Sequence, residues 1–260
     1  MDHLITWGRR LVLALQFLTR VPIKRNLAIS DGDLPASTVF FPLVGFAVGA
    51  FGALCAVIAA ALTQSVWAAS AAAVLGGVLI TGALHVDGLG DTCDGVFSGR
   101  TRDRALEIMR DSRMGSFGVL GITFSILLKV ILLGVALERG GMVALSFMML
   151  VPMAGRLGIV TAAAAGRPAR SDGSGRLFLN SVYAWHFLAA LAFSLIVLVL
   201  FLGAAGLLIA LVAVLAAGLT AWMLSRRLGG LTGDCLGAVN ECAELAALTA
   251  AVALIVYRVL

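Results

Sequence analysis

The uncharged stretch FLAALAFSLIVLVLFLGAAGLLIALVAVLAAGLTAWML, residues 187–224, decides the class of fold. A hydrocarbon core about 30 Å thick is crossed by roughly 20 helical residues, so this run is too long for one crossing. It therefore predicts two membrane helices, joined near GAAG at residues 203–206. Barrel strands alternate over only about 10 residues, so uninterrupted apolar runs of this length indicate helices.

The rest of the chain has the same character. Hydrophobic residues make up 61% of it and charged residues only 13%, whereas soluble domains carry roughly 25% charged residues. The composition predicts an all-α polytopic membrane protein that forms a single integral membrane domain over residues 1–260. About seven transmembrane helices are expected, at residues 39–62, 66–84, 117–137, 142–165, 187–204, 205–224 and 243–258.

The first 38 residues differ from these spans because their apolar run is short and bracketed by charge. LVLALQFL, residues 11–18, lies between Arg9 and Arg10 on one side and Arg20 on the other. An amphipathic helix with a charged face lies in the membrane interface rather than across it. The pattern predicts an interfacial or re-entrant helix before the first span.

The distribution of charge predicts the topology. Four segments between spans hold 15 of the 19 lysines and arginines and 12 of the 14 acidic residues. Since basic residues gather on the cytoplasmic side of a membrane, these segments and the N-terminus are expected to be cytoplasmic. The net charge of +5 then reflects topology and attraction to anionic lipid, and no nucleic acid partner is expected. The four segments are residues 1–38, 85–116, 166–186 and 225–242.

HVDGLGDTCDG, residues 85–95, follows the second predicted span and gathers three aspartates. Asp87, Asp91 and Asp94 are spaced i, i+4 and i+7, so they share one face if that span continues as a helix. Mg²⁺ takes carboxylate oxygens and leaves positions for substrate phosphates, and the intervening glycines would let a bulky ligand approach the backbone. The stretch predicts a magnesium site, with His85 as a candidate proton acceptor. A solvated acidic helix end without a ligand is the alternative.

The next segment carries more charge. MRDSRMGSFG, residues 109–118, places Asp111 and Arg113 ahead of two glycines. A guanidinium group binds phosphate oxygens in a fork, so this pair suits a phosphate and metal site. Glu107 lies one helical turn before Asp111, although a charged helix on the membrane surface would show the same spacing.

The last polar segment, GGLTGDCLGAVNE at residues 229–241, reads as a loop that returns at once to the membrane. Asp234, Asn240, Glu241 and, just beyond them, Glu244 offer a second set of oxygen ligands beside its glycines. Within the spans, Arg156 is costly unless it faces the bundle interior, which makes it a candidate substrate contact. Lys129 is expected to snorkel to the interface or to pair with Glu138.

These motifs together resemble the cobalamin synthase family, the adenosylcobinamide-GDP ribazoletransferases, over about residues 17 to 244. Gly90 and Cys93 depart from the pattern, where alanines are expected, but neither replaces an aspartate. The motifs that carry the resemblance are FLTRVPI (17–23), FFPLVGFAVG (40–49), GALHVDGLGDTCDGVFSGRTRDRALEIMRDSRMGSFGVLG (82–121), VPMAGR (151–156) and GGLTGDCLGAVNE (229–241).

The resemblance implies a Mg²⁺-dependent enzyme of the bacterial cytoplasmic membrane whose active site faces the cytoplasm. It would join α-ribazole, or its 5′-phosphate, to adenosylcobinamide-GDP, with the 5′-hydroxyl or the 5′-phosphate displacing GMP. Membrane lipid and other enzymes acting late in corrinoid assembly are the further partners it implies. The family's acidic motif falls on Asp87, Asp91 and Asp94, and its flanking motifs fall on His85, Glu107, Asp111, Arg113, Asp234 and Glu241. Our hypothesis makes Asp87, Asp91 and Asp94 the metal ligands, His85, Asp111 and Arg113 the catalytic residues, and Glu107, Arg156, Asp234, Asn240 and Glu241 the substrate-binding residues.

Two other classes of function fit parts of the sequence. An ion-coupled transporter would explain charges within spans, but its site usually lies near the midplane between repeated halves, and no convincing internal repeat is present. A lipid phosphotransferase of the CDP-alcohol type also uses aspartates beside a membrane helix. The pattern typical of those enzymes, an Ala-Arg after an Asp-Gly and a later Gly before paired Asp residues, is not found in that order here.

Overall fold

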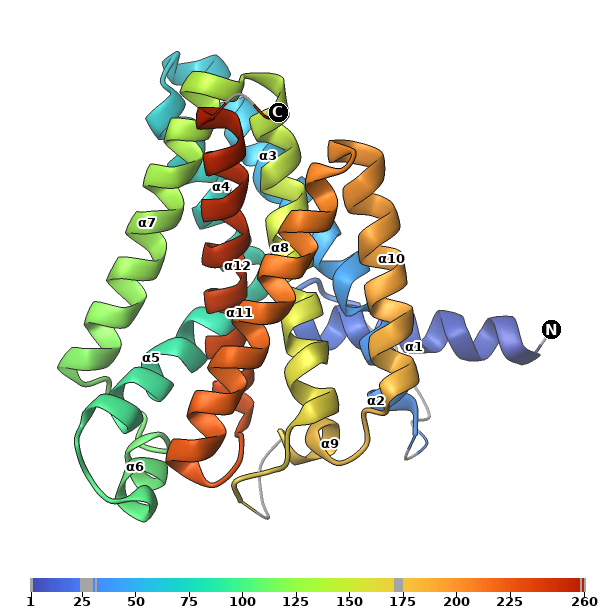
Figure 1. Ribbon diagram of the computed structural model, residues 1–260, viewed down its shortest axis with the longest axis vertical. Helices are drawn as coiled ribbons and strands as arrows, with labels where there is room; N and C mark the ends of the chain where they lie inside the picture. Colours follow the sequence, from blue (N-terminus) through green and yellow to red (C-terminus); the bar gives the residue numbers. More distant parts are fainter. Residues whose placement is uncertain (1, 24–29, 31, 171–174, 258, 260) are drawn as a thin grey trace.

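The computed structural model describes residues 2–23, 30, 32–170, 175–257 and 259, and the side chains of residues 5 onward within these ranges. The described part is a bundle of α-helices without a β-strand, as predicted (Figure 1). In chain order the helices are α1 (Asp2–Leu18), α2 (Asp33–Ser37), α3 (Phe41–Thr63), α4 (Val66–Thr81), α5 (Leu84–Phe97), α6 (Arg102–Ile108), α7 (Ser116–Gly140), α8 (Met142–Ala165), α9 (Arg176–Leu179), α10 (Ala184–Leu202), α11 (Ala205–Leu228) and α12 (Gly233–Val256), with a 3₁₀ turn at Thr38–Phe40.

The number of membrane helices agrees with the prediction. Within the described residues, six helical segments are long and apolar enough to cross a membrane, and the pair α4 and α5 makes a seventh if the two count as one bent span. The predicted boundary between 187–204 and 205–224 is confirmed, because α10 ends at Leu202 and α11 begins at Ala205. Gly203 has a positive φ of 56°, which glycine adopts without strain.

Helix α8 forms the centre of the bundle. It packs against α3, α10, α11 and α12, and most of its side chains are buried. Its contact with α3 is close because glycines face it: a Cβ added at Gly45 would lie 2.5 Å from the backbone oxygen of Pro152, and one at Gly49 2.3 Å from that of Met148. Small residues at such crossings let helices pack tightly in lipid, where no hydrophobic effect drives association.

Two predicted boundaries are wrong. Helix α12 begins at Gly233, ten residues before the predicted span at 243, so most of the expected loop at 229–241 is helical. The second span ends at Thr81 instead of continuing, and α5 runs at 88° to α4. Local hydropathy locates a span by its most apolar stretch. A part of the same helix whose buried face carries polar residues is therefore left out of the predicted span.

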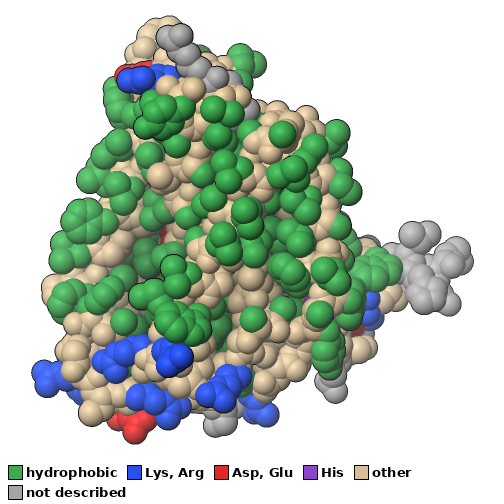
Figure 2. Space-filling view, viewed as in Figure 1, with side chains coloured by type: hydrophobic (Ala, Val, Ile, Leu, Met, Phe, Trp, Pro, Cys, Tyr) green, Lys and Arg blue, Asp and Glu red, His purple; other side chains and the backbone are tan. Residues whose placement is uncertain are grey.

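The surface has an apolar belt and one basic end. Hydrophobic side chains cover the sides of the bundle in Figure 2, and Lys and Arg gather at the end that carries α6 and α9 in Figure 1. Helix α1 lies across the bundle and projects beyond it (Figure 1). A helix over the predicted segment 11–18 is confirmed, and its place in the membrane interface stays a prediction.

Candidate functional site

The bend between α4 and α5 positions the aspartate-bearing helix. Gly82 and Ala83 both have φ of 62°, in the left-handed region, and the chain turns there by 88° between α4 and α5. The segment that follows α1 is tied to the bend, since the backbone N–H of Arg20 donates to the oxygen of Ile80 at 2.7 Å. Helix α5 therefore leaves the bundle axis and carries its aspartates at the basic end.

Helix α5 crosses the start of α12 at two glycines. A Cβ at Gly88 would lie 2.8 Å from the backbone oxygen of Asp234, and one at Gly237 would lie 3.0 Å from that of His85. Gly90 likewise faces Ile122 of α7 and Met114 in the segment before α7. The side chain of Ile122 would lie 2.9 Å from an added Cβ. These glycines serve helix packing, so the expectation that they leave room for a bulky ligand is wrong.

The crossing brings three carboxylates together, and we name Asp87, Asp91 and Asp234 the acidic face. Asp91 is close enough to Asp87 and Asp234 to interact with both electrostatically, and Asp87 with Asp234. Arg170 donates from its guanidinium group to Asp234 at 3.1 Å. Thr232 caps α12 by accepting from the backbone N–H of Cys235 at 3.2 Å, which fixes where Asp234 lies.

Asp94 has a different environment from the other two aspartates of α5. Its two carboxylate oxygens accept the backbone N–H groups of Gly115 at 2.7 Å and Gly118 at 2.8 Å, at the N-terminus of α7. A carboxylate there is favoured by both the unpaired N–H groups and the helix dipole. Asp94 thus joins α5 to α7, a role that the spacing of the aspartates does not reveal.

Carboxylate oxygens are the ligands that Mg²⁺ prefers, so the chemistry of the acidic face fits this ion. Within the described ranges, no group of three or more His, Cys, Asp or Glu side chains is already arranged as a metal site. The predicted roles of Asp87, Asp91 and Asp94 as metal ligands therefore stay predictions.

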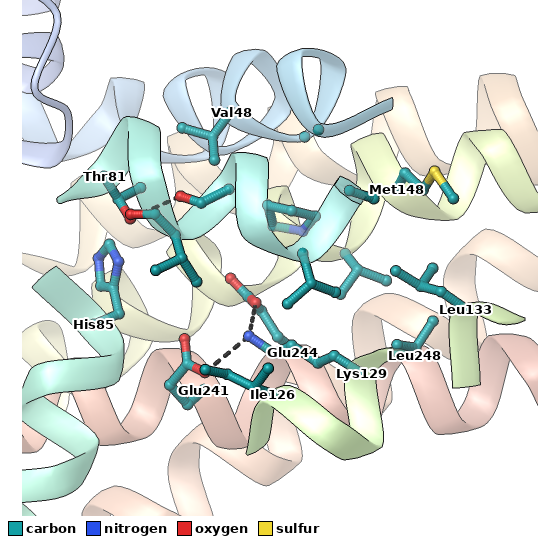
Figure 3. Close-up of a pocket in the computed structure, with 18 of the residues that line it drawn as sticks. Val48, Thr81, His85, Ile126, Lys129, Leu133, Met148, Glu241, Glu244 and Leu248 are labelled. Carbon is teal, nitrogen blue, oxygen red and sulfur yellow. Dashed lines mark hydrogen bonds and ion pairs between the residues drawn. The ribbon is translucent and has the colours of Figure 1, made fainter. Parts of the chain in front are cut away.

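A second polar cluster is buried inside the bundle, and we name it the buried network. Lys129 of α7 donates to Glu241 at 2.8 Å and also contacts Glu244 (Figure 3). Ser125 donates to Glu241 at 2.7 Å. Asn240 donates to Glu244 at 2.9 Å. Lys129 thus pairs with α12, so its expected pairing with Glu138 or snorkelling is wrong.

Arg156 connects this network to α5. Its guanidinium group pairs with Glu244 and lies 3.1 Å from Nδ1 of His85. Arg156 is only a donor, so His85 Nδ1 must accept and the ring carries its proton on Nε2. Nε2 is buried without a hydrogen-bond partner. His85 therefore presents a donor to its surroundings, which does not suit the proton acceptor expected from the sequence.

The buried network lines the polar end of a cavity among α3, α4, α5, α7, α8 and α12 (Figure 3). The remaining walls are apolar, with Val48, Leu133 and Leu248 among them. The cavity volume is about 70 Å³, which is room for a few water molecules but not for a corrinoid. Arg156, Asn240 and Glu241, predicted to bind substrate, lie in this network and not on the acidic face.

The predicted site residues Glu107, Asp111 and Arg113, in and after α6, lie at the surface. Arg113 donates to Asp111 through Nε at 3.0 Å and Nη2 at 2.7 Å, and through its backbone N–H at 3.0 Å. These hydrogen bonds lower the pKa of Asp111 to about 2. Glu107 pairs with Arg104 at 2.6 Å. The carboxylate of Asp111 is therefore a weak base, and its predicted catalytic role stays untested.

Sequence reasoning missed Arg170, and it named Glu244 only as a further oxygen ligand beside Asp234, Asn240 and Glu241. Arg170 follows α8 in a segment whose sequence shows only scattered charge, and its partner Asp234 is 64 residues away. Glu244 was grouped with the ligands of the expected loop, although its spacing from Asn240 and Glu241 matches one face of a helix. That helical spacing is the signal that could have identified α12 as a polar helix.

The fold and these clusters define a multi-pass helical membrane protein with a carboxylate site at its basic end. The chain matches the model of the family described as Cobalamin-5-phosphate synthase over residues 10–252, and it belongs to this family of enzymes. No solved structure matches the chain. The family assignment replaces the transporter and lipid phosphotransferase alternatives.

Three curated relatives match most of this chain and share one name. An adenosylcobinamide-GDP ribazoletransferase of Klebsiella pneumoniae (strain 342) is 40% identical over 240 residues, 89% of this chain and 94% of that protein. Proteins of the same name from Clostridium kluyveri and Clostridioides difficile are each 36% identical, over 241 and 247 residues. They cover 90% and 91% of this chain, and 92% and 94% of their own lengths.

Proposed function

We propose that this enzyme joins α-ribazole, or its 5′-phosphate, to adenosylcobinamide-GDP and releases GMP, with Mg²⁺ bound at the acidic face. The family and the names of its relatives support the transferase reaction. The observation that supports the site is the convergence of Asp87, Asp91 and Asp234 from two helices beside the guanidinium group of Arg170. The carboxylates suit a bound metal ion, and the neighbouring guanidinium group suits a diphosphate.

The name of the family supports a choice of attacking oxygen other than the 5′-oxygen expected from the resemblance. A product described as cobalamin 5-phosphate keeps the 5′-phosphate of the nucleoside, which favours a different ribose hydroxyl as the nucleophile. That oxygen bonds to the phosphorus that carries the cobinamide, and the bond from this phosphorus to GMP breaks. The hydroxyl proton passes to a carboxylate of the acidic face and then to solvent, because His85 accepts from Arg156 and Asp111 is held by Arg113.

Each residue of the site has a task in this scheme. Asp87 and Asp91 would hold Mg²⁺, with Asp234 opposite them, and the ion would neutralise charge that develops on the phosphate oxygens. Asp94 fixes α5 against α7, and Arg170 orients Asp234. His85 and Arg156 hold the opposite side of α5 inside the bundle.

The basic end is proposed to face the cytoplasm of a bacterium. The support is the 15 of 19 lysines and arginines in the four segments between predicted spans, and the gathering of these side chains at one end in Figure 2. The substrates would then reach the acidic face from the cytoplasm, and the apolar belt would lie in the cytoplasmic membrane. Other enzymes of late corrinoid assembly are proposed as neighbours there.

The test is GMP release by purified protein in lipid, with both substrates and with Mg²⁺ present or chelated. Asp91→Ala should lower turnover at least roughly 100-fold and weaken binding of Mn²⁺ measured by electron paramagnetic resonance. Asp103→Ala, at an exposed acid paired with Arg102 at 3.8 Å, is the matched control and should keep both. Release of GMP without a divalent cation, or full turnover by Asp91→Ala, would contradict the proposed metal site.

A further inference from the structure

A cavity separate from the buried network opens beside the acidic face, and we name it the basic cavity. Its volume is about 270 Å³. Arginines from three separate parts of the chain line it, together with the start of α12. The lining residues used below are Arg110, Arg170, Arg176, Thr232, Gly233 and Asp234.

Backbone contacts hold the walls of the basic cavity in place. The segment after α8 pairs with the segment before α12: the N–H of Ala169 donates to Leu231 at 2.8 Å, and the N–H of Leu231 donates to Arg167 at 2.8 Å. On the other wall, a Cβ added at Gly175 would lie 2.4 Å from the backbone nitrogen of Gly233. The segments that carry Arg170 and Arg176 therefore lie directly against the N-terminus of α12.

The residue types that line the cavity suit a phosphate group. Arg110, Arg170 and Arg176 line it, and among the described lining residues Asp234, which Arg170 contacts at 3.1 Å, carries a carboxylate. Helix α12 has 24 residues, and its first turn adds N–H groups and the positive end of the helix dipole. Guanidinium groups bind phosphate oxygens in a planar fork, and several around one cavity provide for more than one phosphate.

The size and position of the cavity limit the kinds of ligand that it can hold. Small-molecule sites usually hold about 300–1,000 Å³, so 270 Å³ admits a diphosphate with part of a nucleoside and excludes a corrin ring. Asp234 belongs to both the basic cavity and the acidic face, so phosphates bound here would lie next to the three carboxylates.

We propose that the basic cavity binds the phosphates of the guanosine diphosphate end of the nucleotide-activated substrate, and holds GMP as it leaves. This inference rests on the proposed function, because it assigns GMP, the leaving group of that reaction, to the basic cavity. The phosphate of an anionic lipid headgroup has the same chemistry and is the other source that the experiment must separate.

The experiment measures binding of GDP to the detergent-purified protein by isothermal titration calorimetry. Arg176→Gln should raise the dissociation constant for GDP at least 10-fold, and Arg110→Gln should act in the same direction. Arg226→Gln is the matched control, since Arg226 also belongs to the basic end but stacks on Trp222 at 5.1 Å, outside the cavity. The control should change GDP affinity less than 2-fold, and elution as a single peak in gel filtration shows that each variant is folded.

Kinetics give a second measurement on the same variants. Arg176→Gln should raise KM for adenosylcobinamide-GDP and leave KM for α-ribazole unchanged. Equal losses of GDP affinity in Arg176→Gln and Arg226→Gln would show an effect of overall charge and overturn the proposal. Unchanged GDP affinity in both Arg110→Gln and Arg176→Gln would overturn it as well.

A lipid arm separates the two phosphate sources. Nanodiscs of phosphatidylglycerol are compared with nanodiscs of phosphatidylcholine, and the proposal expects similar GDP affinity in both. Displacement of GDP by phosphatidylglycerol, with loss of phosphatidylglycerol binding in Arg176→Gln, would assign the cavity to lipid. Arginine-dependent GDP binding without GMP release would contradict the proposed function only, whereas GMP release that no cavity variant alters would contradict the cavity only.

Discussion

Removing the carboxylate of Glu244 should destabilise the protein more than any change at an exposed acid. Glu244 is 5% exposed and pairs with both Lys129 and Arg156, while Glu241 balances the second positive charge. Glu244→Gln keeps the shape of the side chain but leaves two buried cations with one carboxylate. Breaking a buried ion pair by removing one partner costs about 3–5 kcal/mol, and insertion scales give about 3 kcal/mol for one uncompensated charge within a membrane helix.

The assay is the free energy of unfolding in mixed micelles, followed by circular dichroism as the denaturing detergent is increased. Glu244→Gln should lose about 3 kcal/mol or more, and Glu138→Gln, an exposed acid on α7, should stay within about 0.5 kcal/mol of the parent. Adding Lys129→Met to Glu244→Gln restores charge balance and should recover at least about 1 kcal/mol. A loss below about 1 kcal/mol for Glu244→Gln, or strictly additive losses in the double variant, would refute charge compensation in the buried network.

Two further predictions concern Gly118, in the first turn of α7, and Asp111, in the segment before this helix. Gly118→Ala should cost about 1–3 kcal/mol of unfolding free energy, because its Cβ would lie 2.3 Å from a carboxylate oxygen of Asp94. The control Gly218→Ala, whose Cβ would have no atom within 4 Å, should be neutral or stabilising. Equal effects of the two substitutions would argue against the Asp94 contact. The pKa of Asp111 is lowered to about 2 by hydrogen bonds from Arg113, so its contribution to stability is complete above the ordinary value of 3.8 and is lost as the pH falls toward 2. The ratio of turnover between the parent and Asp111→Asn should therefore be constant from pH 5 to 9, and a limb of the pH profile that disappears in Asp111→Asn would show that Asp111 acts as a base.

The sequence determined the class of protein and most of its helices. Apolar runs fix membrane helices because the thickness of the hydrocarbon core sets their length, and this placed the boundary between α10 and α11 at GAAG. The spacing of Asp87 and Asp91 on one helix could also be predicted, since helical periodicity is local. The family resemblance was readable for the same reason, as its motifs are short and contiguous.

Only the tertiary structure decided which polar side chains meet. Asp234 joins Asp87 and Asp91 because α5 runs at 88° to α4 and crosses α12 at Gly88, and neither feature leaves a periodic signal in the sequence. Arg170 reaches Asp234 across 64 residues, and Lys129 reaches Glu241 across 112. Hydropathy and spacing report how a segment relates to its solvent and to its own helix, whereas the partners of buried charges depend on how distant helices pack.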